Sequence, residues 1–355
     1  MNHGRRADLP SAHPSNTTSR RELLRKTVGV AAGGVAAASG ILSVGSSWSI
    51  ADVAPPQIVM PKATSETLVS QLYKSLKEEQ KKAICFPFDH PKRSDVDNNW
   101  FIVKEKVKSF FDGDQQALIK DVFLSIHSEE YAGKVLAQVE HDNKDIGGLG
   151  GCSVAMFGEP GEVNGKSKFE FVLTGRHTTR RCDGNSVAGA AFGGPIFYGH
   201  AADGFNEKAD HKGNAYWYQA ERANEVYKAL DGKQRKLALL DINPPGEHAK
   251  ETVELPIKKE ELDGIPLSEL TKDQKGLVRK VLGDLLAPFR KADADEALAL
   301  IEKAGIDKLH MAFFQKMDIG NDGVWDVWKL ESENMVWYFR GSPHVHTWVH
   351  VREEV

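Results

Sequence analysis

The residues with the clearest chemistry lie close to the C-terminus, in the stretch "PHVHTWVH" from Pro343 to His350. This stretch contains three of the 13 histidines in a chain of 355 residues. Neutral imidazole nitrogens are common ligands of transition metals, so the stretch is a candidate metal site. Because valine, threonine and tryptophan separate the histidines, the stretch also has the composition of a β-strand.

Strand geometry limits which of these histidines can share an ion. In a strand, His344, His346 and His350 project from the same face. Residues two positions apart are separated by about 6.6 Å along the strand, so two imidazoles can lean together and each place a nitrogen about 2.0–2.1 Å from one ion. His350 is about 13 Å from His346 by the same rise per residue, which is too far. We therefore expect a pair, His344 and His346, with a third ligand from elsewhere. The alternative is that these histidines only form the polar face of an exposed strand.

The hydrophobic pattern predicts the elements that must position this pair. Apolar residues recur at helical spacing from Ser65 onward and in five later segments, 115–126, 128–140, 216–230, 270–285 and 294–304. Strand-like runs occupy 169–174, 190–198, 311–316, 324–330, 335–340 and 344–351. Because helical and strand-rich parts are segregated, we predict an α+β fold with helices packed on a mostly antiparallel sheet of mid-chain and C-terminal strands. We expect no internal repeat.

The N-terminal segment has the composition of an export signal. The stretch "SRRELLRK" places Arg20 and Arg21 before two leucines, and a weakly apolar run rich in glycine and alanine follows. This pattern predicts a twin-arginine signal peptide over residues 1–51, with cleavage after Ala51. An N-terminal membrane anchor is the alternative, but the apolar run contains little Leu, Ile or Phe. We predict a periplasmic or secreted protein that meets the twin-arginine translocase during export, with a linker over 52–64 and a single domain over 65–355.

Composition narrows the class of protein further. Six of the 46 basic residues and two of the 50 acidic residues lie in the predicted signal, so residues 52–355 carry a formal charge of −8. Such a surface argues against a nucleic-acid partner. No later segment is long and apolar enough to predict a stable membrane span. Cys85, Cys152 and Cys182 show no CxxC spacing and allow at most one disulfide.

Several stretches in order along the chain resemble a known bacterial family of exported proteins. They are "LYKSLKEEQKKAICFPFDHPKRSDVDNNW", "MFGEPG", "FEFVLTGRH", "FGGPIFYG", "LDGKQRKLALL" and "HVHTW". This series is similar to the family catalogued as domain of unknown function 3500, whose activity is not established. Members typically carry a "GHH" motif after a mid-chain strand and a "HxH" motif near the C-terminus. The resemblance therefore adds His177 to His344 and His346, whereas Arg176 and the residues after the second motif depart from the family pattern.

His177 is the best candidate for the third ligand of the predicted metal site. It follows a strand-like run and lies two residues after Gly175, which would let another backbone come close. If the mid-chain and C-terminal strands pair, the three rings can converge. Cys182 is an alternative fourth ligand, but we expect it to be a small packed residue. We expect His200 and His211, which flank a loop-like segment, to lie at the surface. Arg176 and Arg180 are candidate contacts for an anionic substrate.

Two functions remain open on the sequence alone. The first is an exported metalloprotein in which His177, His344 and His346 bind one zinc, copper or iron ion, and which acts as a metal-dependent enzyme on a small anionic substrate. The second is a metal-free periplasmic protein that binds a small ligand or another protein. The sequence identifies neither the reaction nor a nucleophile and base at a useful spacing, and it does not decide whether the protein is an enzyme.

Overall fold

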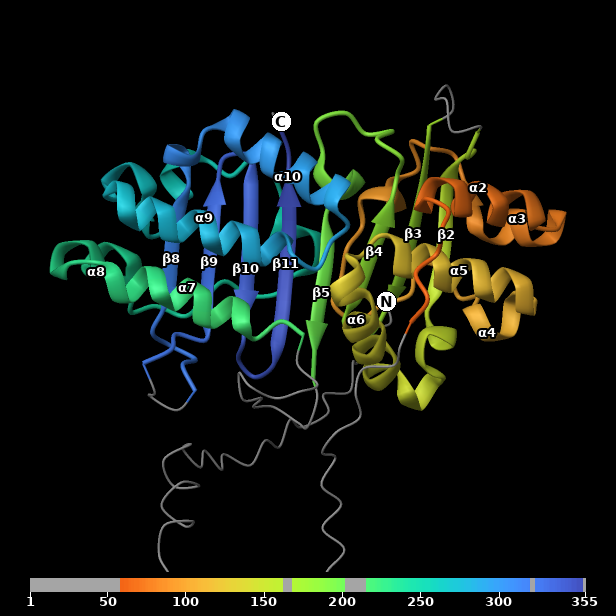
Figure 1. Cartoon of the computed structure of the whole chain (residues 1–355), viewed down its shortest axis with the longest axis horizontal. Helices are drawn as coiled ribbons and strands as arrows, with labels where there is room; N and C mark the ends of the chain where they lie inside the picture. Colours follow the sequence, from red (N-terminus) through yellow and green to blue (C-terminus); the bar gives the residue numbers. More distant parts are fainter. Residues whose placement is uncertain (1–57, 162–167, 202–214, 320–322, 354–355) are drawn as a thin grey trace, which may run out of the picture.

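A computed structural model describes residues 58–161, 168–201, 215–319 and 323–353 (Figure 1). Eleven strands form one sheet, in the spatial order β1-β2-β3-β4-β5-β11-β10-β9-β8-β6, with β7 paired to β8. All neighbours are antiparallel except β1·β2 and β6·β8. The strands are β1 (Cys85–Phe86), β2 (Ser153–Gly158), β3 (Phe169–Gly175), β4 (Thr178–Cys182), β5 (Ile196–His200), β6 (Leu239–Leu240), β7 (Ile265–Pro266), β8 (His310–Phe314), β9 (Val327–Ser332), β10 (Met335–Arg340) and β11 (Val345–Val351).

The helices lie in front of this sheet in the view of Figure 1 and cover one of its faces. They are α2 (Ser65–Ser75), α3 (Glu78–Ile84), α4 (Val107–Phe110), α5 (Gly113–Ser125), α6 (Glu129–Asp142), α7 (Tyr218–Ala229), α8 (Gly232–Ala238), α9 (Lys272–Leu286) and α10 (Lys291–Ala304). The large apolar core lies between the helices and the sheet. A smaller cluster, which includes Phe197, Tyr338 and Trp348, lies on the other face and packs against Val96 and Val253 from irregular segments.

The predicted fold class is confirmed, and so are most of its elements. The helical segments expected between 115 and 304 are all present, and β10 has the predicted bounds. One predicted strand boundary differs, and one strand was not predicted. The strand expected over 190–198 begins only at Ile196, because residues 191–193 form a 3-10 turn. Strand β4 was not expected, because its two buried arginines and two threonines lack an apolar face.

The sheet consists of two equivalent halves, so the expectation of no internal repeat is wrong. In each half, two helices lead into a two-residue strand that runs parallel to the first strand of a four-stranded antiparallel meander. In the first half this order is α2, α3, β1, then β2 to β5; in the second it is α7, α8, β6, then β8 to β11. The halves meet where the last strand of each, β5 and β11, pair antiparallel (Figure 1).

The two halves also share sequence and side-chain contacts. The stretch "LYKSLKEEQKKAICFPFDHP" (72–91) aligns with "VYKALDGKQRKLALLDINPP" (226–245), and "FGGPIFYGH" (192–200) aligns with "RGSPHVHTW" (340–348). Gln80 exchanges hydrogen bonds of 2.9 and 3.1 Å with Gln115, which caps α5. The aligned Gln234 exchanges bonds of 3.0 and 2.7 Å with Gln274, which caps α9. Such matching pairs indicate a duplicated framework, and we name its halves the N-half (65–200) and the C-half (218–351).

Within the described residues, we find no helix with the length and apolar character required to cross a membrane. The predicted signal peptide, with Arg20 and Arg21, lies outside the described residues, as does His211.

Candidate metal centre

His177 occupies the tight turn that joins β3 to β4. It adopts a left-handed backbone conformation with φ of 57°, which is uncommon for a residue other than glycine. Three backbone contacts hold this geometry. The Asn143 side chain binds the amide and the carbonyl of Arg176 at 3.0 and 3.1 Å, and the His177 amide donates to the Asn98 carbonyl at 2.8 Å. The turn therefore fixes the direction of the His177 ring.

The glycine before this turn permits a close approach, as expected, but by side chains rather than by another backbone. A Cβ on Gly175 would lie 2.6 Å from the sulfur of Cys152 and 3.3 Å from the Asn143 side chain. These contacts require glycine at this position, because Cβ atoms do not approach sulfur so closely. Gly175 thus allows Asn143 to reach the turn that carries His177.

His344 and His346 come from the start of the central strand β11. His346 is the second residue of this strand and pairs with Gly199 of β5, whereas His344 immediately precedes it. A Cβ on Gly199 would lie 3.3 Å from the His346 ring and 2.3 Å from the Val345 carbonyl. His346 and Trp348 point to the same face, as the alternation predicted, because both side chains contact Glu247.

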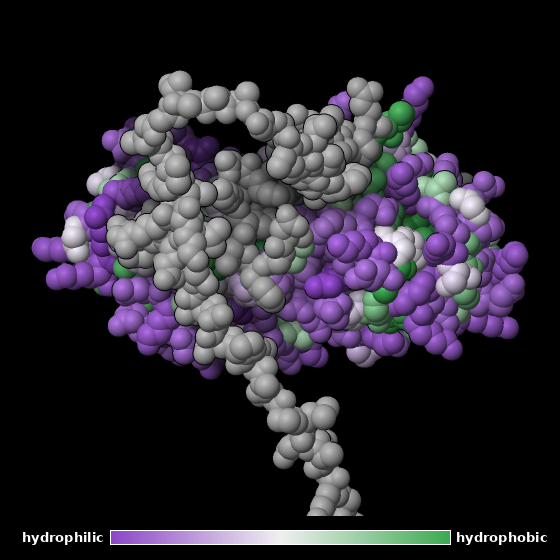
Figure 2. All heavy atoms as spheres, turned by 90° about the horizontal axis from the view of Figure 1, so that it is seen from below, coloured by the Kyte–Doolittle hydropathy of each residue, from purple (hydrophilic) through white to green (hydrophobic). Residues whose placement is uncertain are grey.

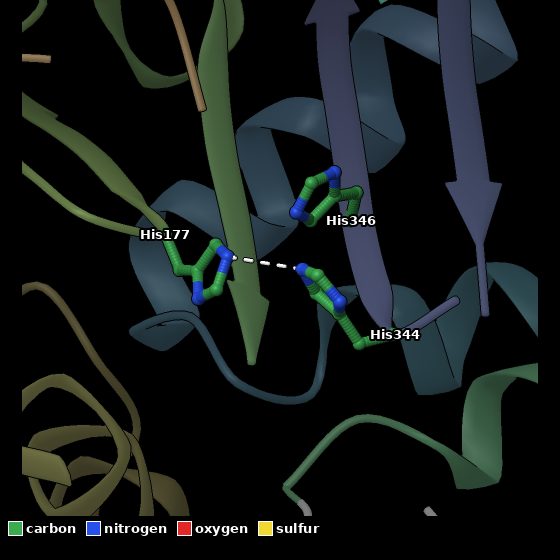
Figure 3. A group of neighbouring side chains, drawn as sticks. All are labelled: His177, His344 and His346. Atoms are coloured by element: carbon green, nitrogen blue, oxygen red, sulfur yellow. Dashed lines mark hydrogen bonds between the residues drawn. The ribbon is translucent and has the colours of Figure 1, made fainter. Parts of the chain in front are cut away.

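The three rings converge, which confirms that the mid-chain and C-terminal strands meet in one sheet (Figure 3). Nε2 of His177 lies 3.2 Å from Nε2 of His344, and one ligand nitrogen from each of the three histidines lies within 4.8 Å of the others. Ligand atoms at about 2.0–2.1 Å from a tetrahedral zinc ion are about 3.3 Å apart. His177 and His346 are 6% and 9% exposed. Nε2 of His346 is buried without a hydrogen-bond partner among the described residues.

A carboxylate approaches the outer nitrogen of His177 from the helix-covered face of the sheet. Oδ2 of Asp142, the last residue of α6, lies 3.1 Å from Nδ1 of His177 and 3.2 Å from Nδ1 of His200. The contact to His200 meets hydrogen-bond geometry, whereas the contact to His177 does not. A carboxylate on Nδ1 favours the tautomer in which Nε2 carries the lone pair, which is the form that binds a metal.

A second carboxylate holds His346 from the opposite face of the sheet. Oε1 of Glu247 accepts hydrogen bonds from Nδ1 of His346 at 2.7 Å and from the Trp348 indole at 2.8 Å. Its Oε2 lies 3.1 Å from Nη1 of Arg340. Glu247 is thereby fixed on three sides and orients Nε2 of His346 away from itself. The same arrangement of carboxylate, imidazole and metal recurs in known metal sites.

Local electrostatics set the protonation states that a metal site requires. Burial lowers the pKa of His344 to about 3, with help from His346 and His177. Burial likewise lowers the pKa of His177 despite the nearby Asp142. Although burial alone would raise the pKa of Glu247, hydrogen bonds from His346 and Trp348 bring it to about 2. Contacts with His177 and His200 similarly hold the pKa of Asp142 well below its ordinary value. At neutral pH, His177 and His344 are therefore neutral, whereas Asp142 and Glu247 are charged.

The two arginines predicted to contact a substrate occupy different places. Arg176 is exposed in the turn beside His177. Arg180 is 3% exposed and points to the helix-covered face, where it donates to Nε2 of His127 at 3.2 Å and to the Tyr216 hydroxyl at 3.2 Å. It also donates to the Phe197 carbonyl. Since these internal partners take up the guanidinium, we leave Arg180 out of the candidate site.

The structure also tests the predictions for the other histidines and for the cysteines. His200 is 2% exposed, so the expectation that it lies at the surface is wrong, because β5 continues through it into contact with α6. His350 binds the Val253 carbonyl at 2.8 Å through Nδ1, away from the triad. All three cysteines are free thiols, and Cys182 is buried, as expected for a packed residue. Burial raises its pKa, which disfavours the thiolate that a metal would need.

Sequence reasoning missed Asp142, Glu247 and Asn143. Asp142 and Asn143 lie at the end of a predicted helix, where polar residues are ordinary caps, and Glu247 lies in a segment without periodicity. One signal was available, because the aligned segments of the repeat place Glu247 opposite Arg93 and so mark it as a departure from the duplicated pattern.

The end of the sheet that carries the triad is viewed in Figure 2, where the described side chains are mainly hydrophilic.

Comparison with known proteins identifies one relationship. No curated protein and no solved structure matches this chain. The model of a family described as "Protein of unknown function (DUF3500)" matches residues 60–352, which is most of the chain. The chain therefore belongs to the DUF3500 family.

Proposed function

We propose that this protein is an exported metalloprotein that binds one divalent transition-metal ion through Nε2 of His177, His344 and His346. The arrangement of the two carboxylates carries the proposal. Asp142 contacts Nδ1 of His177 from one face of the sheet, and Glu247 binds Nδ1 of His346 from the other. Each outer nitrogen faces a carboxylate, which directs the inner nitrogen of the same ring toward a common point.

The donor set suits zinc, copper or iron. Three imidazoles leave at least one coordination position open, and an ion bound in this way supplies a Lewis acid that polarises or acidifies what occupies that position. The protein's own residues would exclude bulk water, since His177 and His346 are nearly buried. Arg176 is exposed beside His177 and would attract a small anionic substrate. Metal-assisted hydrolysis and oxidation both remain compatible with this site.

One observation favours a second function, a metal-free site for a small ligand. The 3.2 Å contact between His177 and His344 has the length of a hydrogen bond between imidazoles. If Nε2 of one ring carries a proton, the pair needs no ion, and the buried Nε2 of His346 remains available to a ligand.

Elemental analysis of the full chain, purified through its native export route, separates the two functions. The proposal predicts tightly bound metal that is reduced by one ion per chain in His346→Ala, with the circular dichroism spectrum unchanged. His248→Ala is the matched control, because His248 is exposed and outside the triad. Wild-type protein that stays metal-free after growth with ample zinc, copper and iron contradicts the proposal and leaves the metal-free function.

A further inference from the structure

We infer that a second divalent transition-metal ion binds beside the triad, between His141, Asp142 and His200. One potential ligand atom from each of these residues lies within 4.8 Å of the others. Asp142 and His200 are buried, and none of the three belongs to the proposed triad. The inference therefore stands on its own residues and does not require the first site to be occupied.

The separations between the ligand atoms fit an ion of the size of Zn²⁺. Nδ1 of His200 lies 3.2 Å from Oδ2 of Asp142, and Nδ1 of His141 lies 3.7 Å from Oδ1. Around a tetrahedral ion with ligand bonds of about 2.0–2.1 Å, neighbouring ligand atoms are about 3.3 Å apart. Small side-chain shifts would complete this geometry, because the His141 side chain is 39% exposed and free to adjust.

A second observation concerns Nδ1 of His141. This atom is buried and has no hydrogen-bond partner among the described residues, although its own side chain reaches solvent elsewhere. It faces the Asp142 carboxylate at a distance too long for a hydrogen bond and suited to a shared ion. The His141 ring also lies 5.7 Å from the His200 ring, edge to face, so both imidazoles border the same small volume.

The backbone at this point favours a cation. His141 and Asp142 are the last two residues of α6, a helix of 14 residues, and the C-terminal end of a helix carries partial negative charge. His200 reaches them from the end of β5. Two imidazoles and one carboxylate form a borderline donor set that suits zinc or iron better than calcium or magnesium.

Asp142 would connect the two ions. Its Oδ2 already lies 3.1 Å from Nδ1 of His177, so one carboxylate would ligate the second ion and contact a ligand of the first. In the structure, Asp142 and His200 share a hydrogen bond of 3.2 Å. Ion binding at Nδ1 would require the neutral tautomer of His200 that carries its ring proton on Nε2, so the proton moves within the ring and no other reactant is needed.

Stoichiometry tests the inference. Full-length chain stripped with a chelator would be titrated with ZnCl₂ and analysed by calorimetry and elemental analysis, alongside His200→Ala, His141→Ala, His346→Ala and the exposed control His248→Ala. We expect two zinc ions in wild type and control. We expect one ion in each of the variants His200→Ala and His346→Ala, and none in a variant that combines these two substitutions. Because His141 is partly exposed, His141→Ala should fold even if His200→Ala does not, and should weaken one of the two binding events at least tenfold.

The two proposals fail in different ways. Wild type that binds one ion, lost in His346→Ala but fully retained in His141→Ala and His200→Ala, overturns the second site and leaves the triad intact. Loss of one ion in His141→Ala and His200→Ala but not in His346→Ala supports the second site and contradicts the triad. If wild type binds one ion or none, and His141→Ala and His200→Ala do not change that number, the second site is overturned. Asp142 then only contacts His177 and hydrogen-bonds His200.

Discussion

Strands β5 and β11 form the central pair of the sheet, and similar elements surround its two ends. The side chains at these two ends differ in chemical type. At one end, β5 finishes at His200 beside the start of β11, the β3–β4 turn and the end of α6. At the other end, β11 finishes beside the start of β5, the β9–β10 turn and the end of α10. We call these the histidine end and the opposite end. Both ends are therefore built from matching elements, and we compare the side chains that these elements carry.

None of the proposed ligands is repeated at the opposite end. In the aligned segments, apolar or aromatic residues replace the C-terminal histidines, and neither a histidine nor an acid occupies the α10 positions aligned with His141 and Asp142. Position by position, Ile196 aligns with His344, Tyr198 with His346, Arg93 with Glu247, and "KAG" (303–305) with "HDN" (141–143). Since the framework forms without these residues in one half, the fold does not require them in the other. This difference argues that the histidine end serves a function rather than stability.

The carboxylate that orients His346 should show the largest contrast between the two ends. Glu247→Gln keeps the size of the side chain but removes the charge that holds Nδ1 of His346. We expect zinc affinity to fall by about 10- to 100-fold, as is usual when such a partner is lost. Arg93→Gln at the aligned position should leave zinc affinity unchanged, although it breaks the 2.9 Å ion pair with Glu170 and lowers stability. Competition against a chromophoric chelator measures both. Equal zinc affinities in wild type and Glu247→Gln would mean that Glu247 has no part in the site.

The next contrast concerns the helix ends. Asn143 is 1% exposed and binds both backbone groups of Arg176, whereas its counterpart, Gly305, has no side chain. Asn143→Ala should lower the free energy of unfolding by about 1–3 kcal/mol, because the amide and the carbonyl of Arg176 lose their side-chain partner. It should also weaken zinc binding severalfold, since the His177 turn loosens. A variant with lower stability in urea but unchanged zinc affinity would show that the turn is held by other contacts.

Because the two halves share one framework, equivalent substitutions should lower the free energy of unfolding by similar amounts. Gln80→Ala and Gln234→Ala each remove one side of a glutamine pair, together with the bonds that this side chain makes to backbone groups such as the Phe110 and Glu269 carbonyls. Each should destabilise the protein by about 1–3 kcal/mol in urea denaturation, with Gln80 at the upper end because it is more buried. Lys233→Ala, at an exposed helix position, is the control and should have little effect. A neutral result for either glutamine would break the equivalence of the two halves.

The smallest effect concerns the dependence of stability on pH in the metal-free protein. His344 has a pKa of about 3 in the folded state, below its ordinary value. The unfolded chain therefore binds more protons below about pH 6.5, and stability falls as the pH decreases from there toward 3. The contribution of His344 is at most about 1.4 kcal/mol per pH unit. His344→Asn should give a flatter curve between pH 6.5 and 4, measured by thermal melts. An unchanged slope would show that this ring is not held neutral.

Part of this account could be predicted from sequence, and part could not. Periodicity and alternation are local signals, so they located helices such as α5 and strands such as β10. The His344–His346 pair also followed from strand geometry alone. Asp142 and Glu247 could not be found in this way, because their roles depend on contacts with residues about 35 and 99 positions away. Arg180 lies close in sequence to His177, which suggests a ligand contact, but its guanidinium is hydrogen-bonded to buried groups of the core.

The most direct test is a crystal structure of the full chain grown with ZnCl₂, with diffraction data collected on both sides of the zinc absorption edge. The account predicts an anomalous peak about 2.0–2.1 Å from Nε2 of His177, His344 and His346, with none at the opposite end of β5 and β11. A map without a peak between these three nitrogens, or with rings that point apart, would contradict the claim that the histidine end is a metal centre.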